Sequence, residues 1–138
     1  MDLTSKAFVK SLLKQYGIRA SNGLGQNFLI NRRAIEKIID TAELQPEDVV
    51  LEIGPGLGVL TQELAKRAKK VIGVEKDPKM VEILKGLLEC WNVRNVEIIQ
   101  GDIRISDFPN IDNRKSDIQK YKVIGNLPFY LTAPVIRK

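Results

Sequence analysis

One short segment late in the sequence combines residues that could hold and activate an amine. Asn126, Leu127, Pro128 and Phe129 follow an apolar run that is typical of a buried strand. The Asn126 amide oxygen and a nearby backbone carbonyl could accept both protons of an exocyclic amine, while Pro128 fixes the backbone. The nitrogen lone pair would then face an electrophile without the help of a titrating base. As an alternative, the same residues could form an ordinary turn.

A glycine-rich segment forms the second candidate site. Gly54, Gly56 and Gly58 follow the apolar run 49–53 and precede a helical pattern, an order that predicts strand, loop and helix with a ligand lying against bare main chain. Val59 stands where the dinucleotide fingerprint requires glycine, and Pro55 has no amide to donate. The loop therefore does not match a pyrophosphate cradle, although it could also serve only to pack a helix on a strand.

Acidic residues end the next two apolar runs. Glu75 occupies the position from which a carboxylate accepts hydrogen bonds from both ribose hydroxyls, which indicates a nucleoside. Asp102 could accept the amino proton of an adenine, with Ile103 and Pro78 covering the ring. The alternative for each acid is a solvated residue at a strand end.

Alternating strands and helices must position these residues. Apolar runs predict strands at 49–53, 71–74, 96–99 and 121–124, and helices between them predict an α/β fold with a parallel sheet. Two earlier helices are expected, one capped by Thr4 or Ser5 and one by Asn31. In such sheets ligands bind beyond the carboxyl ends of the strands, where the candidate residues lie.

Composition excludes several classes of function. The 138 residues suit one domain, and they include no apolar run long enough for a membrane span and no signal-peptide pattern, so a cytoplasmic protein is expected. The absence of histidine removes histidine-based catalysis and most transition-metal sites, and no metal is expected. The single cysteine, Cys90, lies in an apolar helical pattern and is expected to be buried.

The net charge of +5 lies in residues 1–37, which carry seven basic and two acidic residues, 7 − 2 = +5. A basic N-terminal quarter is expected of a segment that faces polyanionic nucleic acid. The alternative is a solvated basic helix. The basic residues proposed to contact RNA are Lys6, Lys10, Lys14, Arg19, Arg32 and Arg33.

Taken together, these motifs resemble the ribosomal RNA adenine N6,N6-dimethyltransferase family, the kasugamycin-sensitivity methylases. The resemblance covers residues 24–138 in order and rests on the following segments: Gly25–Leu29, Glu52–Gly58 with Leu60-Thr61, Glu75, Gly101-Asp102 and Asn126–Phe129. It implies a Rossmann-like class I fold and a methyltransferase dependent on S-adenosylmethionine. The implied reaction is dimethylation of N6 on adjacent adenosines of small-subunit rRNA during ribosome biogenesis.

The resemblance also assigns roles to single residues. Those implied to bind the cofactor are Gln26, Asn27, Leu29, Gly54, Gly56, Gly58, Glu75, Lys76, Asp102, Ile103 and Asn126. Asn126 and the Leu127 carbonyl would hold the target amine, and Phe129 would stack on the base. Phe129 stands where the family often has tyrosine, so Tyr130 is an alternative stacking ring and RNA contact.

Three alternative functions are compatible with parts of the sequence. The 23S rRNA adenine methylases share related motifs, and a non-catalytic RNA-binding module of ribosome assembly could keep the same fold. An NAD-dependent oxidoreductase is disfavoured by Val59 and by the lack of a residue placed for hydride chemistry.

This chain is shorter than the members of the family that its motifs resemble. Residues 1–30 are interpreted as a basic helix with a cofactor-closing segment, and residues 31–138 as the N-terminal part of the catalytic domain. The remaining strands and a C-terminal helical domain are expected to be missing. The piece would then bind S-adenosylmethionine without full activity, and its fourth strand would be an open sheet edge capable of self-association.

Overall fold

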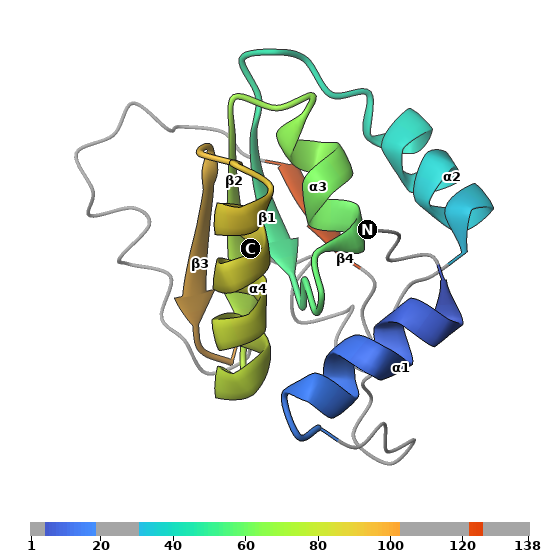
Figure 1. Ribbon diagram of the computed structural model, residues 1–138. Coiled ribbons are helices and arrows are strands. Elements are labelled where there is room, and N and C mark those ends of the chain that lie inside the picture. Colours follow the sequence, from blue (N-terminus) through green and yellow to red (C-terminus); the bar gives the residue numbers. More distant parts are fainter. Residues whose placement is uncertain (1–4, 19–30, 103–121, 126–138) are drawn as a thin grey trace.

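The computed structural model describes residues 5–18, 31–102 and 122–125. Within these residues the chain forms four helices and four strands in one α/β unit (Figure 1). The strands are β1 (Val49–Ile53), β2 (Lys70–Glu75), β3 (Val96–Gln100) and β4 (Lys122–Gly125). The helices are α1 (Lys6–Gln15), α2 (Arg32–Ala42), α3 (Val59–Ala65) and α4 (Pro78–Cys90).

The strands form a parallel sheet in the order β3-β2-β1-β4. β1 and β2 are buried along almost their whole length, which explains why their sequences read as continuous apolar runs rather than as alternating ones. The predicted α/β class, the four strands and their parallel arrangement are therefore confirmed. In the described part of the sheet, β3 and β4 are the edge strands.

Three of the helices begin at side-chain caps. The Ser5 hydroxyl accepts a hydrogen bond from the Phe8 amide at 3.3 Å, the Asn31 side chain accepts from the Arg33 amide at 2.9 Å, and Asp77 accepts from the Lys79 amide at 2.9 Å. Each bond satisfies an amide that the first helical turn leaves without a partner. The predicted caps of α1 and α2 are confirmed, with Ser5 rather than Thr4 as the cap of α1.

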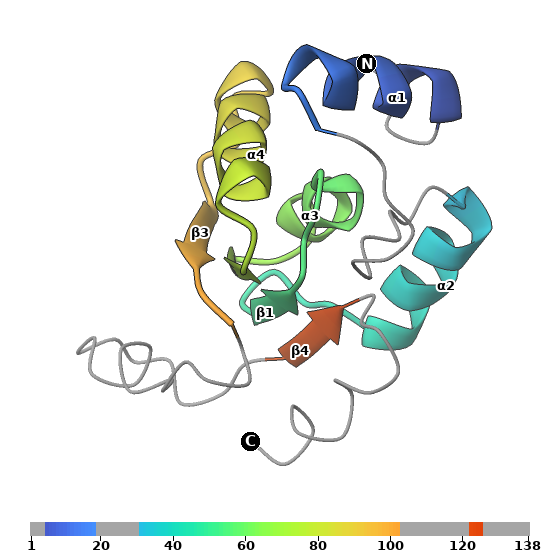
Figure 2. The same ribbon diagram turned by 90° about the horizontal axis from the view of Figure 1, so that it is seen from below.

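The helices α2, α3 and α4 lie on one face of the sheet, and α1 crosses the end of this layer beside α4 (Figure 2). One apolar cluster joins α2 and α3 to the first residues of β1 and β2 through Ile35, Leu64, Val50 and Val71. A second cluster joins α1 to α4 and to the loop after β1. The glycine loop is therefore held between the sheet and two helices.

Cys90 departs from its predicted environment. The cysteine is the last residue of α4 and is exposed, so the expectation of a buried residue is wrong. The inward face of α4 ends at Leu88, and the cysteine lies beyond it. No helix in the described ranges is long and apolar enough to cross a membrane.

Candidate cofactor site

The glycine loop uses its own amides to hold its shape. The Gly54 amide donates to the Val74 carbonyl at 2.9 Å, and the Gly58 amide donates to the Pro55 carbonyl at 2.9 Å. The Gly56 amide donates to the Glu75 carboxylate at 3.1 Å. Pro55 has no amide hydrogen. These amides are committed inside the protein, so the loop is not built as an anion cradle of the kind that binds a pyrophosphate.

The glycines of the loop have different surroundings, although all three have positive φ angles. A Cβ on Gly54 would meet nothing within 4 Å, whereas a Cβ on Gly58 would lie 2.5 Å from Leu84 Cδ1. Gly54 therefore leaves open space beside the backbone, and Gly58 allows the start of α3 to pack closely on α4.

Glu75 lies at the centre of the site. It ends β2, is only 8% exposed, and accepts hydrogen bonds from Gly56 through Oε2 and from the Asp77 amide through Oε1 at 3.2 Å. The side chain thus connects the glycine loop to the start of α4. A carboxylate has about four acceptor positions, so these two bonds leave acceptor capacity for ligand hydroxyls.

A buried pair beneath the loop was missed by the sequence reasoning. The Thr61 hydroxyl on α3 donates to Glu52 Oε2 on β1 at 2.5 Å, and the two residues are 0% and 1% exposed. Burial raises the pKa of Glu52 to about 8, against the lowering effect of the Thr61 hydrogen bond, and the charge of Glu75 adds to the rise. The available signal was an acid interrupting an apolar strand, followed nine residues later by threonine in a helix.

The end of β3 lies beside Glu75. The Gly101 amide donates to the Glu75 backbone carbonyl at 2.9 Å, and Gln100 pairs with Glu75 in the sheet. Asp102 is half-buried and follows directly, so the structure brings this predicted residue to the same sheet edge. Lys76, next to Glu75 in sequence, is exposed.

The register of β4 shows where the segment predicted to bind an amine begins. Gly125 pairs with Ile53, the residue before Gly54, and a Cβ on Gly125 would lie 2.6 Å from the Ile53 carbonyl oxygen. Asn126 therefore follows the residue that pairs with the end of β1. The predicted site residues outside the described ranges are Gln26, Asn27, Leu29, Ile103, Asn126, Leu127, Pro128, Phe129, Tyr130 and Arg19.

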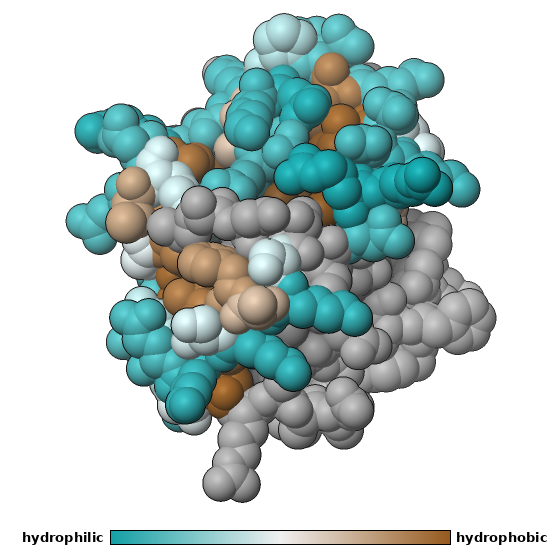
Figure 3. Space-filling model, turned by 45° about the vertical axis from the view of Figure 1, so that its right-hand side comes forward, coloured by the Kyte–Doolittle hydropathy of each residue, from teal (hydrophilic) through white to brown (hydrophobic). Residues whose placement is uncertain are grey.

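The basic residues lie on the outer surfaces of the first two helices. Lys6, Lys10 and Lys14 are exposed on α1, and Arg32 and Arg33 are exposed in the first turn of α2. Figure 3 turns the α1 and α2 side of the molecule forward, and its coloured surface is mostly hydrophilic. A hydrophilic surface with several exposed basic side chains is suited to a polyanion.

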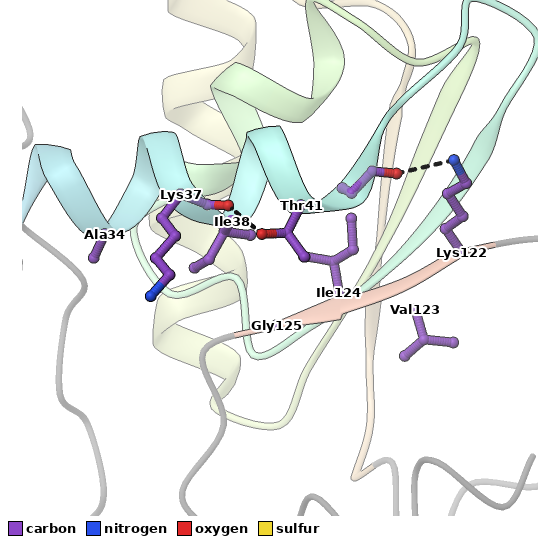
Figure 4. Close-up of a pocket in the computed structure, with 9 residues that line it drawn as sticks. Ala34, Lys37, Ile38, Thr41, Lys122, Val123, Ile124 and Gly125 are labelled. Carbon is purple, nitrogen blue, oxygen red and sulfur yellow. Dashed lines mark hydrogen bonds between the residues drawn. The ribbon is translucent and has the colours of Figure 1, made fainter.

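A hollow of roughly 710 Å³ lies between α2 and β4, and neither Glu75 nor the glycine loop is among its lining residues. Ala34, Lys37, Ile38 and Thr41 line it from α2, and the residues of β4 line it from the sheet (Figure 4). The Lys122 amino group donates to the Ala42 and Glu43 carbonyls at 2.9 Å each, and pairs with Asp48 at 3.0 Å. This side of β4 is therefore fixed to the end of α2.

Comparison with known proteins decides the family. Residues 17–138 match the family model described as ribosomal RNA adenine dimethylase. The chain belongs to this family. A probable ribosomal RNA small subunit methyltransferase A from Thermococcus onnurineus is 50% identical over 125 residues, which cover 91% of this chain and 42% of that protein. The resemblance inferred from the motifs is therefore confirmed for the rRNA adenine dimethylase family.

Solved structures of methyltransferases share the fold of this chain. The 23S rRNA methyltransferase ErmE aligns with a TM-score of 0.67 at 33% identity, covering 80% of this chain and 41% of that one. A dimethyladenosine transferase from Plasmodium falciparum aligns with a TM-score of 0.65 at 33% identity, covering 78% and 36%. The predicted Rossmann-like methyltransferase fold is confirmed. The chain spans less than half the length of the curated relatives described, 42% of the Thermococcus protein and 47% of one from Alkaliphilus metalliredigens.

Proposed function

We propose that this chain is the cofactor-binding part of a methyltransferase that uses S-adenosylmethionine to dimethylate N6 of adjacent adenosines in small-subunit rRNA, in the cytoplasm, during ribosome biogenesis. The observation that carries the proposal is the position of Glu75, whose carboxylate contacts the middle of the glycine loop. A carboxylate at this point favours hydroxyl groups and cations and disfavours phosphate. A nucleoside that carries a sulfonium and an ammonium group fits this chemistry, and the internal hydrogen bonds of the loop amides disfavour a pyrophosphate.

Each residue of the site would hold a different part of the cofactor. Glu75 would hold the two ribose hydroxyls, Asp102 the adenine amino group, and the open backbone at Gly54 would lie against the methionine portion. Lys76 and the residues of the segment 26–29 would complete the cofactor pocket. The cofactor supplies an electrophilic methyl group on sulfur.

The target amine would be held at the end of β4. Asn126 and the Leu127 carbonyl would accept its two protons, Pro128 would keep the turn rigid, and Phe129 or Tyr130 would stack on the base. Orientation of the nitrogen lone pair replaces a titrating base, which suits a chain without histidine. The exposed basic residues of α1 and α2, together with Arg19, would contact the rRNA backbone.

Two binding titrations and one transfer assay test the proposal. Calorimetry is expected to show binding of S-adenosylmethionine and no binding of NAD at the same concentrations. The 138-residue chain and a full-length relative are then incubated with labelled cofactor and immature small subunits, and the modified nucleotides are mapped by mass. Binding of NAD instead of S-adenosylmethionine would contradict the assigned cofactor.

A second candidate function is methylation of 23S rRNA. It is favoured by the similarity to ErmE, which is as high in identity as the similarity to the dimethyladenosine transferase. Transfer of label to large-subunit rRNA rather than to small subunits would support this candidate. A full-length form that binds rRNA and never transfers label would indicate a non-catalytic assembly factor.

The β4 edge is a candidate contact between copies of the chain. Among the described residues β4 pairs with β1 alone, and Val123 is 41% exposed. A strand edge with free backbone groups can pair with another strand. Sedimentation over a range of protein concentrations is expected to show a dimer that Val123→Lys weakens, and a monomer throughout would contradict self-association.

A further inference from the structure

Leu57, the one large side chain in the middle of the glycine loop, points away from the open side of the site. It is 1% exposed and belongs to an apolar cluster with Met80, Ile83 and Leu87 of α4. The other members of the cluster come from α1, namely Val9, Leu12 and Leu13. The loop is thus fastened to the N-terminal helix as well as to the sheet.

The contact between α1 and the rest of the chain is made by the side chains of this one cluster and its neighbours. Ile18, which follows the helix, packs against the same cluster, and its amide donates to the Leu13 carbonyl at 2.9 Å. The Tyr16 hydroxyl lies 3.9 Å from the Cβ position of Gly86 on α4. The exposed side of the same helix carries Lys6, Lys10 and Lys14. One helix therefore presents charge to solvent and apolar groups to the loop.

The loop has a physical need for such support. Gly56 and Gly58, on either side of Leu57, have φ angles of 58° and 84°. Glycine has more conformational freedom than any other residue, so holding several glycines in one conformation costs entropy. A buried leucine between two glycines restricts both of them, and its burial stabilises the ordered loop.

We propose that α1 is a positioning element for the glycine loop, acting through Leu57, and that its apolar face sets the affinity for S-adenosylmethionine without contacting it. The inference rests on the proposed function for the identity of the ligand. When α1 packs loosely, the loop occupies its binding conformation for a smaller fraction of the time. The apparent dissociation constant then rises by the inverse of that fraction.

The experiment compares two buried truncations of the same kind. Leu12→Ala removes apolar contacts from the cluster that holds Leu57. Ile35→Ala is the matched control, since Ile35 is 3% exposed on α2 and lies in the separate cluster with Val50 and Leu64. Circular dichroism and thermal unfolding establish that each variant is folded at the working temperature, and Leu12→Met supplies a conservative replacement.

Hydrogen exchange gives a readout that needs no ligand. The Gly56 and Gly58 amides, both hydrogen-bonded in the loop, are expected to exchange about tenfold faster in Leu12→Ala and at the wild-type rate in Ile35→Ala. Calorimetry is expected to show affinity for S-adenosylmethionine lowered about tenfold in Leu12→Ala, within about twofold of wild type in Ile35→Ala, and restored in Leu12→Met.

The outcomes separate the two proposals. Equal exchange rates at both glycines in Leu12→Ala and Ile35→Ala would overturn the positioning role of α1, whatever the ligand. Faster exchange in Leu12→Ala alone, with no binding of S-adenosylmethionine even by the wild type, would support the positioning role and contradict the proposed cofactor.

Discussion

The Glu75 carboxylate accepts a hydrogen bond from the Gly56 amide over 3.1 Å, which ties the end of β2 to the middle of the glycine loop. Residues far apart in sequence are thereby held at one sheet edge. The bond also gives the loop a negative neighbour and occupies an amide that a phosphate would need. This hydrogen bond and the spacing of the glycines both disfavour a pyrophosphate at the loop.

Alanine substitutions at Gly54 and Gly58 are expected to separate binding from stability. Gly58→Ala brings a Cβ to 2.5 Å from Leu84 Cδ1 at a φ of +84°, so it should lower the free energy of unfolding by about 2–3 kcal/mol. Gly54→Ala has open space but a φ of +66°, so it should cost only about 1 kcal/mol. Chemical denaturation measures both.

The affinity for S-adenosylmethionine is the second quantity to measure for Gly54→Ala. Gly54→Ala places a methyl group on the open side of the loop and is expected to weaken S-adenosylmethionine binding at a temperature at which the variant is fully folded. Wild-type affinity in Gly54→Ala would show that no ligand lies against this residue.

Glu52→Gln is expected to change the pH dependence of stability. Burial raises the pKa of Glu52 to about 8, so between its unfolded pKa and about pH 8 the folded state keeps a proton that the unfolded state releases. The wild type therefore loses stability as pH rises through this window. Glutamine has no proton to lose, so the Tm difference between the variant and the wild type should shift in favour of Glu52→Gln from about pH 5 to about pH 9. A constant Tm difference would show that Glu52 keeps an ordinary pKa.

Lys122→Met tests the attachment of β4 to α2. The Lys122 amino group caps α2 at two carbonyls, and its loss is expected to cost about 1–2 kcal/mol. Lys70→Met is the control, because the Lys70 side chain is 38% exposed against 39% for Lys122 and forms an ion pair with Glu97 at 3.2 Å. The control should change stability by no more than about 0.5 kcal/mol. Equal losses in urea denaturation would refute a capping role for Lys122.

Replacing Lys6, Lys10 and Lys14 by glutamine tests the RNA-facing surface of α1. The triple variant is expected to weaken binding to an rRNA fragment and to reduce the slope of log affinity against log salt by about 2–3. Lys79→Gln with Lys85→Gln, at exposed positions on α4, serves as control and should leave the slope unchanged. An unchanged slope in the triple variant would identify α1 as a solvated face.

Much of the fold was predictable because the hydrophobic pattern and the helix caps of the sequence indicate the same strands and helices. The apolar runs of β1 and β2 are long enough to mark buried strands, and Asn31 and Asp77 are strong helix caps. Parallel strands then place Glu75 and Asp102 at one edge. The sequence therefore predicted which residues meet there.

The contacts that shape the loop could not be predicted in the same way. The Glu52 and Thr61 side chains meet because a strand and a helix are packed at one particular angle, which no residue spacing encodes. Leu57 could equally have faced a ligand, and the packing of α1 and α4 around it shows that it faces the core. Cys90 is the last residue of an apolar helical pattern, and the face of α4 that packs against the core ends before this residue.

The most direct test of the account is calorimetric titration of S-adenosylmethionine into the wild type, Glu75→Ala and Glu82→Ala, an exposed acid on α4 that serves as control. The account predicts binding by the wild type, similar binding by Glu82→Ala, and affinity at least about tenfold lower in Glu75→Ala, since hydrogen bonds to a charged group contribute about 1.5–3 kcal/mol. Equal affinity in Glu75→Ala and the wild type would contradict the assignment of Glu75 to the cofactor.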